Sequence, residues 1–202
     1  LSNCRGTQIK LQQLLRGPNG LAPALFALAK RATTAVPSGM AAVELLQAAG
    51  LWDEHSRAAA SIIPLLTRAL KHEEHVAVAQ RLLRGFATKL AVGTAAFKAA
   101  VDALGDSGAI RDAVTALVEH REEDRSEAAC SLVFVFKVCA SPDDKHTCYV
   151  ANSGLHDALP ALLASDDQRY AVFARALTAF FESDRGVASR QELLGMASAV
   201  QV

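Results

Sequence analysis

The chain has 202 residues, with 21 Lys or Arg and 21 Asp or Glu, so its formal net charge is zero. Domains that bind nucleic acid or anionic membrane surfaces normally carry a basic excess. The even balance therefore argues against both and favours a protein partner. Hydrophobic residues make up 51% of the chain, yet no apolar run reaches the ~18 to 20 residues that a membrane-spanning helix needs.

Apolar residues recur at helical spacing along most of the chain, and clusters of Gly, Pro, Ser or Asp interrupt them. This pattern predicts an all-α protein. In chain order, we expect helices near residues 4–16, 20–33, 39–49, 56–71, 74–89, 94–104, 108–119, 126–139, 146–152, 155–164, 168–182 and 186–199. Pro64 and Pro160 are expected in first helical turns, where a missing N–H costs nothing.

The segment Leu132–Phe136 has the composition of a strand but lies in a long Ala-rich helical context. We expect it to be a helix that is buried nearly all round.

Three stretches of the chain resemble one another, each with an apolar helix, an acidic turn and a second helix rich in Ala and Leu. Leu83, Leu132 and Leu177 occupy matching positions, 49 and 45 residues apart. Such a period is typical of an array in which each unit buries too little surface alone and stacks on its neighbours.

The stretch from Gly154 to Phe181 resembles the second and third helices of an armadillo repeat, with Gly-Leu-x-x-x-Leu-Pro-x-Leu-Leu, a Ser-Asp-Asp turn and an Ala/Leu-rich helix. The resemblance extends, more weakly, over almost the whole chain. It implies a right-handed α-α superhelix, an armadillo-like solenoid of about three to four three-helix repeats. We expect one domain over 1–202, with a partial repeat 1–36, repeats 37–91, 92–141 and 142–183, and the start of a further repeat at 184–202.

The first residues, Leu1–Arg5, have neither an initiator Met nor the apolar segment of a secretory signal. We therefore expect the chain to be a piece of a longer protein.

In armadillo proteins the third helices line a concave groove, where importin-α and β-catenin relatives carry a ladder of Trp and Asn. In this sequence the Asn positions hold Gly85, Phe134 and Ala179, and the Trp positions hold Arg or Cys. Recognition of a nuclear-localisation peptide is therefore not expected.

The same third-helix faces offer other side chains for a protein partner, because Arg and aromatic residues are enriched at interface hot spots. The spacing is equally compatible with Phe134 as a core residue. The candidate protein-binding residues are Arg81, Arg84, Phe134, Lys137, Arg175 and Thr178.

The His and Cys residues lack the spacing of metal ligands. In His72-Glu73-Glu74-His75 the His residues are three apart, whereas a zinc-protease helix needs four. We interpret this turn as solvated, and likewise His146 and Cys148 near Asp143. The four Cys residues form no Cys-x-x-Cys pair, which favours buried free thiols in a reducing compartment.

Gly105–Gly108 follows a helix and lacks the Lys of a phosphate loop, so we interpret it as a helix–helix connector. We expect no catalytic residue, metal, cofactor or small-molecule ligand.

The sequence therefore predicts a non-catalytic scaffold or adaptor that binds proteins. The alternative is a structural subunit embedded in a large intracellular assembly, such as a cytoskeletal, ciliary or mitochondrial complex. An enzyme on a HEAT-like scaffold ranks third, since a DNA-repair glycosylase would need a basic concave face. The expected location is intracellular, most simply the cytoplasm.

Overall fold

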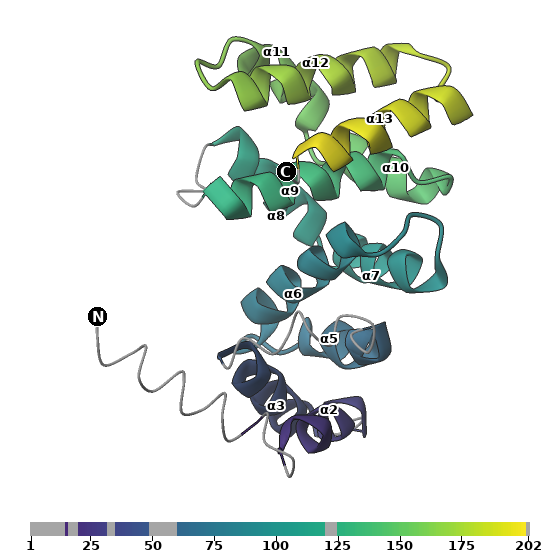
Figure 1. Cartoon of the computed structure of the whole chain (residues 1–202). Helices are drawn as coiled ribbons and strands as arrows, with labels where there is room; N and C mark the ends of the chain where they lie inside the picture. Colours follow the sequence, from purple (N-terminus) through teal and green to yellow (C-terminus); the bar gives the residue numbers. More distant parts are fainter. Residues whose placement is uncertain (1–14, 16–19, 32–34, 49–59, 120–124, 201–202) are drawn as a thin grey trace. The chain divides into compact units, whose positions relative to one another are not determined.

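The computed structural model of the chain describes residues 15, 20–31, 35–48, 60–119 and 125–200 (Figure 1). Every regular element within these ranges is a helix, which confirms the all-α prediction. The helices are α2 (Ala22–Arg31), α3 (Val36–Ala48), the 3-10 helix η1 (Ala60–Ile62), α5 (Ile63–Ala69), α6 (Val76–Lys89), α7 (Ala95–Asp106), α8 (Ala109–Val118), α9 (Arg125–Cys139), α10 (Asp144–Ala151), α11 (Leu155–Leu163), α12 (Gln168–Glu182) and α13 (Val187–Val200). In this part of the chain no helix is both long and apolar enough to cross a membrane. Apart from Leu15, the helix predicted over 4–16 lies outside the described residues.

Most helix bounds agree with the periodicity of the sequence, and two departures concern proline. Helix α3 begins at Val36, three residues before the predicted start, because Pro37 is tolerated in a first helical turn. The prediction for Pro160 was wrong: α11 begins at Leu155, so Pro160 lies inside the helix. Pro160 is exposed, and water can therefore bond the carbonyl that its missing N–H leaves unpaired.

The chain divides into two compact units, residues 1–82 and 83–202, which we call the N-terminal and C-terminal units. In the N-terminal unit, α2 packs along α3, and α3 packs against α5. Its core includes Leu15, Ala22 and Leu46, with Leu25 and Phe26 packed against them. As expected, Pro64 lies in the first turn of α5.

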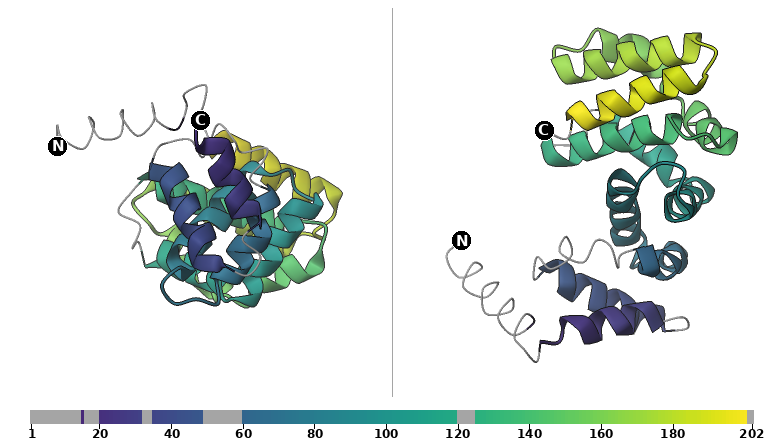
Figure 2. Two further views of the ribbon diagram at one scale, coloured as in Figure 1. Left: turned by 90° about the horizontal axis from the view of Figure 1, so that it is seen from below. Right: turned by 45° about the vertical axis from the view of Figure 1, so that its right-hand side comes forward.

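The C-terminal unit contains the last residues of α6, 83–89, and helices α7 to α13. Helix α8 packs against α7, α9 and α11, while α10 packs against α7, α8 and α9, and α11 packs along α12. The run Leu132–Phe136 is buried throughout, as its sequence predicts, because α9 contacts neighbours on several sides. Helix α13 packs most extensively against α9 and also touches α12. In Figure 1 and the right-hand view of Figure 2 it lies between these two helices.

Side chains at the helix starts fix where three of these helices begin. Thr94 accepts a hydrogen bond from the backbone N–H of Phe97 at the start of α7. Asp143 and Asp167 accept from the N–H of Lys145 and Arg169 at the starts of α10 and α12. These side chains satisfy N–H groups that have no partner within the helix. The two carboxylates also complement the positive end of the helix dipole.

Candidate functional site

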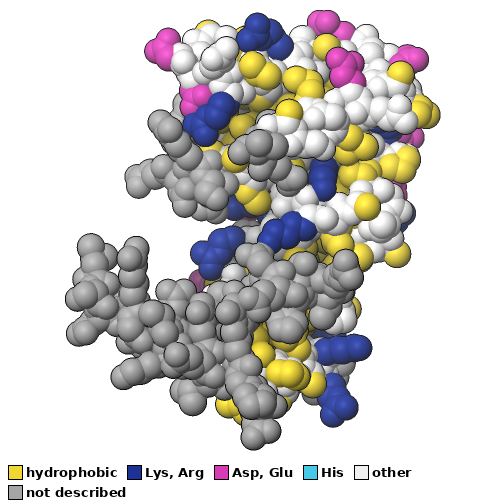
Figure 3. Space-filling model, viewed as in Figure 1, with side chains coloured by type: hydrophobic (Ala, Val, Ile, Leu, Met, Phe, Trp, Pro, Cys, Tyr) yellow, Lys and Arg dark blue, Asp and Glu magenta, His cyan; other side chains and the backbone are white. Residues whose placement is uncertain are grey.

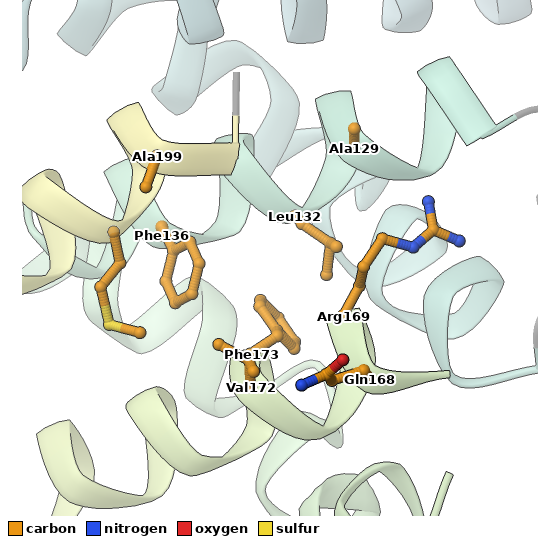
Figure 4. A pocket seen from close by; sticks show the side chains of 9 residues that line it. Ala129, Leu132, Phe136, Gln168, Arg169, Val172, Phe173 and Ala199 are labelled. Carbon is orange, nitrogen blue, oxygen red and sulfur yellow. The ribbon is translucent and has the colours of Figure 1, made fainter. Parts of the chain in front are cut away.

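Helices α9 and α12 form the walls of an apolar pocket of about 530 Å³ in the C-terminal unit. The aromatic rings of Phe136 on α9 and Phe173 on α12 lie 5.0 Å apart between their centroids. Figure 4 shows Phe136, Leu132 and Phe173 pointing into the space between the helices. The lining residues are Ala129, Leu132, Phe136, Gln168, Arg169, Val172, Phe173, Met196 and Ala199. A mostly apolar pocket with a polar edge is suited to an apolar side chain of a partner.

Helix α13 forms the third wall of this pocket through Met196 and Ala199. Leu193 and Ala197 are its buried side chains, and Arg190 on α13 contacts the carboxylate of Asp144 on α10 at 3.4 Å. The other described side chains of α13 are half-buried or exposed. The pocket is therefore bounded on one side by a helix with two buried side chains among its described residues.

Gln168 and Arg169, in the first turn of α12, supply the polar edge of the pocket. The guanidinium of Arg169 contacts the carboxylate of Asp167 at 2.6 Å. Near the pocket mouth, Val172 keeps 38% of its surface exposed. On the face that Figure 3 shows, apolar side chains reach the surface of the C-terminal unit beside charged ones.

Two of the residues predicted to bind a partner have structural roles instead. Phe134 is only 1% exposed, so the core alternative holds and this residue leaves the candidate surface. The ammonium of Lys137 donates hydrogen bonds to the carbonyls of Thr88 and Leu90, the latter at 3.0 Å. Burial lowers the pKa of Lys137. The side chain of Lys137 thus forms hydrogen bonds with the end of α6.

The remaining candidate residues differ in solvent exposure. Arg81 and Arg175 are exposed, while Arg84 and Thr178 are half-buried. The Nε of Arg175 donates to the carbonyl of Ala171, one turn earlier in α12, at 3.2 Å. Arg81 belongs to the N-terminal unit, whereas Arg84 and Arg175 belong to the C-terminal unit. A row of the three arginines therefore stays a prediction.

A buried histidine joins α10 to α7, where the sequence suggested a solvated loop. His146 is buried; its Nδ1 lies 2.8 Å from Ser141 Oγ and its Nε2 lies 3.5 Å from Asp102 Oδ1. Lys145 Nζ lies 3.1 Å from the same carboxylate oxygen. Burial lowers the pKa of His146, so the ring is neutral at pH 7. Ser141 then donates to Nδ1, and Nε2–H faces the carboxylate.

This histidine also borders a second pocket, of about 500 Å³, whose wall includes Lys98, Ser141 and Asp143. Lys98 Nζ contacts Asp143 Oδ2 at 2.6 Å, and the ion pair holds the pKa of Asp143 below its ordinary value. Ser141 is itself buried, and its Oγ accepts from the N–H of Asp143 at 3.3 Å. The solvated interpretation holds for the exposed Asp144 and Cys148 and is wrong for His146.

The other polar groups that the sequence singled out lie apart from both pockets. His72 is exposed and His75 half-buried in the turn before α6. Among the described residues, no three His, Cys, Asp or Glu side chains are arranged to hold a metal ion. Cys139 is buried, which raises the pKa of its thiol to about 12, whereas Cys148 is exposed. The expectation of buried thiols thus holds for Cys139, whereas Cys130 is half-buried and Cys148 is exposed.

The pocket residues themselves were not predicted from the sequence. The signal that pointed toward them was the apolar run Leu132–Phe136, since Leu132 and Phe136 are one turn apart and share a helix face. Their partners on α12 and α13 could not be chosen without the packing of the helices.

Comparison of the chain with models of known families and with curated proteins gave no match, and comparison with solved structures gave none either. A proposal of function therefore rests on the helices, the pocket and their chemistry.

Proposed function

We propose that the chain is a non-catalytic scaffold of armadillo-like helical repeats that binds a protein through its third helices, α9 and α12. In the C-terminal unit two successive triplets, α7–α8–α9 and α10–α11–α12, follow the expected repeat order. The first helices of the two triplets contact each other, and so do the second helices. Such contacts support stacking of the first and second helices of two repeats, whereas α13 lies between the third helices.

The observation that carries a binding role is the apolar pocket between α9 and α12. It lies on the faces that the repeat order assigns to the groove, with Val172 at the surface and Arg175 exposed one turn further along α12. Apolar contacts bordered by an arginine are characteristic of interface hot spots. An acidic or carbonyl-rich segment would complement Arg175 through paired hydrogen bonds that Lys would not reproduce.

The chemistry of His146 supports a role other than catalysis. Ser141, His146 and Asp102 contain the residue types of a nucleophilic triad, and Ser141 borders the second pocket, but Ser141 is only 1% exposed and its Oγ accepts from the N–H of Asp143. A nucleophile must reach the reacting atom of its substrate. We infer that Ser141, His146 and Asp102 stabilise the packing of α10 on α7.

The test of this proposal is quantitative capture of cellular proteins by the full chain and by its Arg175→Ala variant. Arg111→Ala is the matched control, because Arg111 is also exposed but belongs to α8, a second helix. We expect the Arg175 variant to lose about 1 kcal/mol or more of binding free energy and the Arg111 variant to bind as the wild type does. Binding that survives combined replacement of Arg81, Arg84 and Arg175 by Ala would place the interface elsewhere.

One observation favours the alternative, a structural subunit embedded in a larger assembly. The N-terminal unit exposes three leucines, Leu21 at 59% and Leu28 and Leu45 at 45% each. If these side chains form one contiguous patch, its burial against another protein would stabilise the unit. This alternative predicts that a Leu21→Ser, Leu28→Ser variant loses its partners while the Arg175→Ala variant keeps them.

A further inference from the structure

We propose that the face formed by α9 and α12 is a binding site for an amphipathic helix, and that α13 is its exchangeable occupant within the chain. The inference rests on the proposed protein-binding function and adds the kind of partner and the way in which the site is regulated. A partner helix would take the place of α13 and fill the pocket with larger apolar side chains.

The first observation is that this face already holds a helix. Helix α13 packs against α9 more extensively than against its sequence neighbour α12, and it lies between the two helices in Figures 1 and 2. The backbone spacing and side-chain shape of this face therefore accommodate an α-helix. Because the element that packs on this face is a helix, we infer that the partner is also a helix. The apolar character of the pocket alone would not give this.

The second observation is that α13 fits the face incompletely. Beneath it a pocket of about 530 Å³ remains, with Met196 and Ala199 as the contribution of α13 to its wall. A helix with Leu or Phe at the position of Ala199 would place apolar atoms in this space and gain contacts that α13 does not make. The site thus favours an amphipathic helix with larger side chains than α13 carries.

The third observation is that α13 buries few large apolar side chains, although it contacts α9 extensively. Leu193 is its one large buried side chain within the described residues, whereas α12 buries Tyr170, Phe173, Leu177 and Phe180. A helix with so little buried apolar surface is expected to open locally more readily than the rest of its unit.

The fourth observation is the connection that precedes α13. Arg185 has a φ of 54°, a left-handed conformation that is unfavourable for a residue with a side chain. Arg190 on α13 holds this turn through a hydrogen bond from its Nε to the carbonyl of Arg185 at 2.9 Å. Release of α13 would break this hydrogen bond, while the N–H of Arg185 would keep its bond to Ser183 Oγ.

The first test is hydrogen exchange of the full wild-type chain, measured separately for α13 and α9. We expect the amides of α13 to exchange at least about tenfold faster than those of α9, because local opening releases α13 first. Equal protection of the two helices would mean that α13 leaves only when the whole unit unfolds, and would overturn the proposal.

The second test is binding of a fluorescent peptide with the sequence of residues 187–200 to the full chain. Leu193→Asp in the protein should release the resident helix and raise the affinity for the peptide at least about tenfold, because the internal competitor is removed. Val187→Asp is the control, since Val187 is on the same helix but 73% exposed. A peptide carrying Ala199→Leu should bind more tightly than the unmodified peptide.

Protection of α9 and α12 in the Leu193→Asp variant checks that the rest of the unit remains folded. Failure of that folded variant to bind either peptide, or equal binding by the wild type and the variant, would overturn the proposal. Neither test uses a cellular partner. If α13 exchanges but the Arg175→Ala variant captures partners as the wild type does, only the proposed function is contradicted. If the variant loses capture but α13 does not exchange, only the exchangeable helix is contradicted.

Discussion

The ammonium of Lys137, on α9, donates a hydrogen bond of 3.0 Å to the carbonyl of Leu90, just beyond the end of α6. The same ammonium also donates to the carbonyl of Thr88. Carbonyls in the last turn of a helix have no partner within it, so one cation satisfies two such groups. A residue predicted to bind a partner thus joins α9 to the last turn of α6, which belongs to the same unit.

Replacing Lys137 by Met should lower the free energy of unfolding by about 1 to 3 kcal/mol, because the two carbonyls lose their charged donor. Met keeps most of the length of the side chain, so the change isolates the ammonium. Denaturant unfolding followed by circular dichroism measures the effect. Arg111→Met, at an exposed position of α8, is the control and should change stability by less than about 0.5 kcal/mol. Equal effects of the two substitutions would refute the assigned role of Lys137.

Gly105 lies beneath the ring of Tyr149, and a methyl group at this position would overlap the ring. The Tyr149 hydroxyl donates to the carboxylate of Asp106, which holds the ring in place. Gly105→Ala should therefore destabilise the chain by about 1 to 3 kcal/mol, although Ala is the better helix former.

The double variant Gly105→Ala, Tyr149→Ala separates the clash from other effects. If the ring is the obstacle, adding Gly105→Ala to a chain that already carries Tyr149→Ala should cost little or nothing. Thermal unfolding of the four proteins in this cycle gives the answer. An equal cost in both backgrounds would show that the ring is not the obstacle.

Stability should depend on pH through His146. Burial lowers the pKa of this residue in the folded chain, whereas in the unfolded chain it titrates near about 6.5. The unfolded state therefore binds the proton more readily, and stability falls as pH drops from about 7.5 through 6.5 toward the folded pKa. The groups that face the ring are Ser141 and Asp102, with Lys145, Asp143 and Lys98 close by.

His146→Gln should flatten the dependence between pH 7.5 and 5, where a single group contributes at most about 1.4 kcal/mol per pH unit. Urea unfolding at several pH values compares the two proteins. The carboxylate of Asp143, whose pKa Lys98 lowers, loses its contribution only at more acidic pH and so does not mask the effect. An unchanged slope in the variant would assign the dependence to other groups.

Local features of the fold could be predicted because they depend on neighbouring residues. The periodicity of apolar side chains placed α12 at residues 168–182, as observed. The run Leu132–Phe136 had too few polar positions to leave one face in water, and its burial followed from that. Proline was harder: whether Pro160 falls in the first turn or inside α11 depends on where the helix begins, and Gly154 fixed that start with a φ of 82°.

The site depended on contacts between segments far apart in the chain. Lys137 and Leu90 are 47 residues apart, and nothing near Lys137 in the sequence marks the carbonyls that it meets. His146 lies in a polar segment, and its burial follows from the packing of α10 on α7. The apolar pocket exists because α13 packs back onto α9, a choice that helical periodicity does not specify.

The most direct test of the proposed protein-binding face compares two equally exposed apolar positions in the full chain. Val172 on α12, a third helix, is 38% exposed, and Leu163 on α11, a second helix, is 39% exposed. A photo-crosslinking amino acid placed at either position reports which proteins contact it in cells. We predict that the same partner is captured at Val172 in repeated experiments and is absent at Leu163. Capture at Leu163 alone, or equal capture at both positions, would contradict binding through the third-helix face.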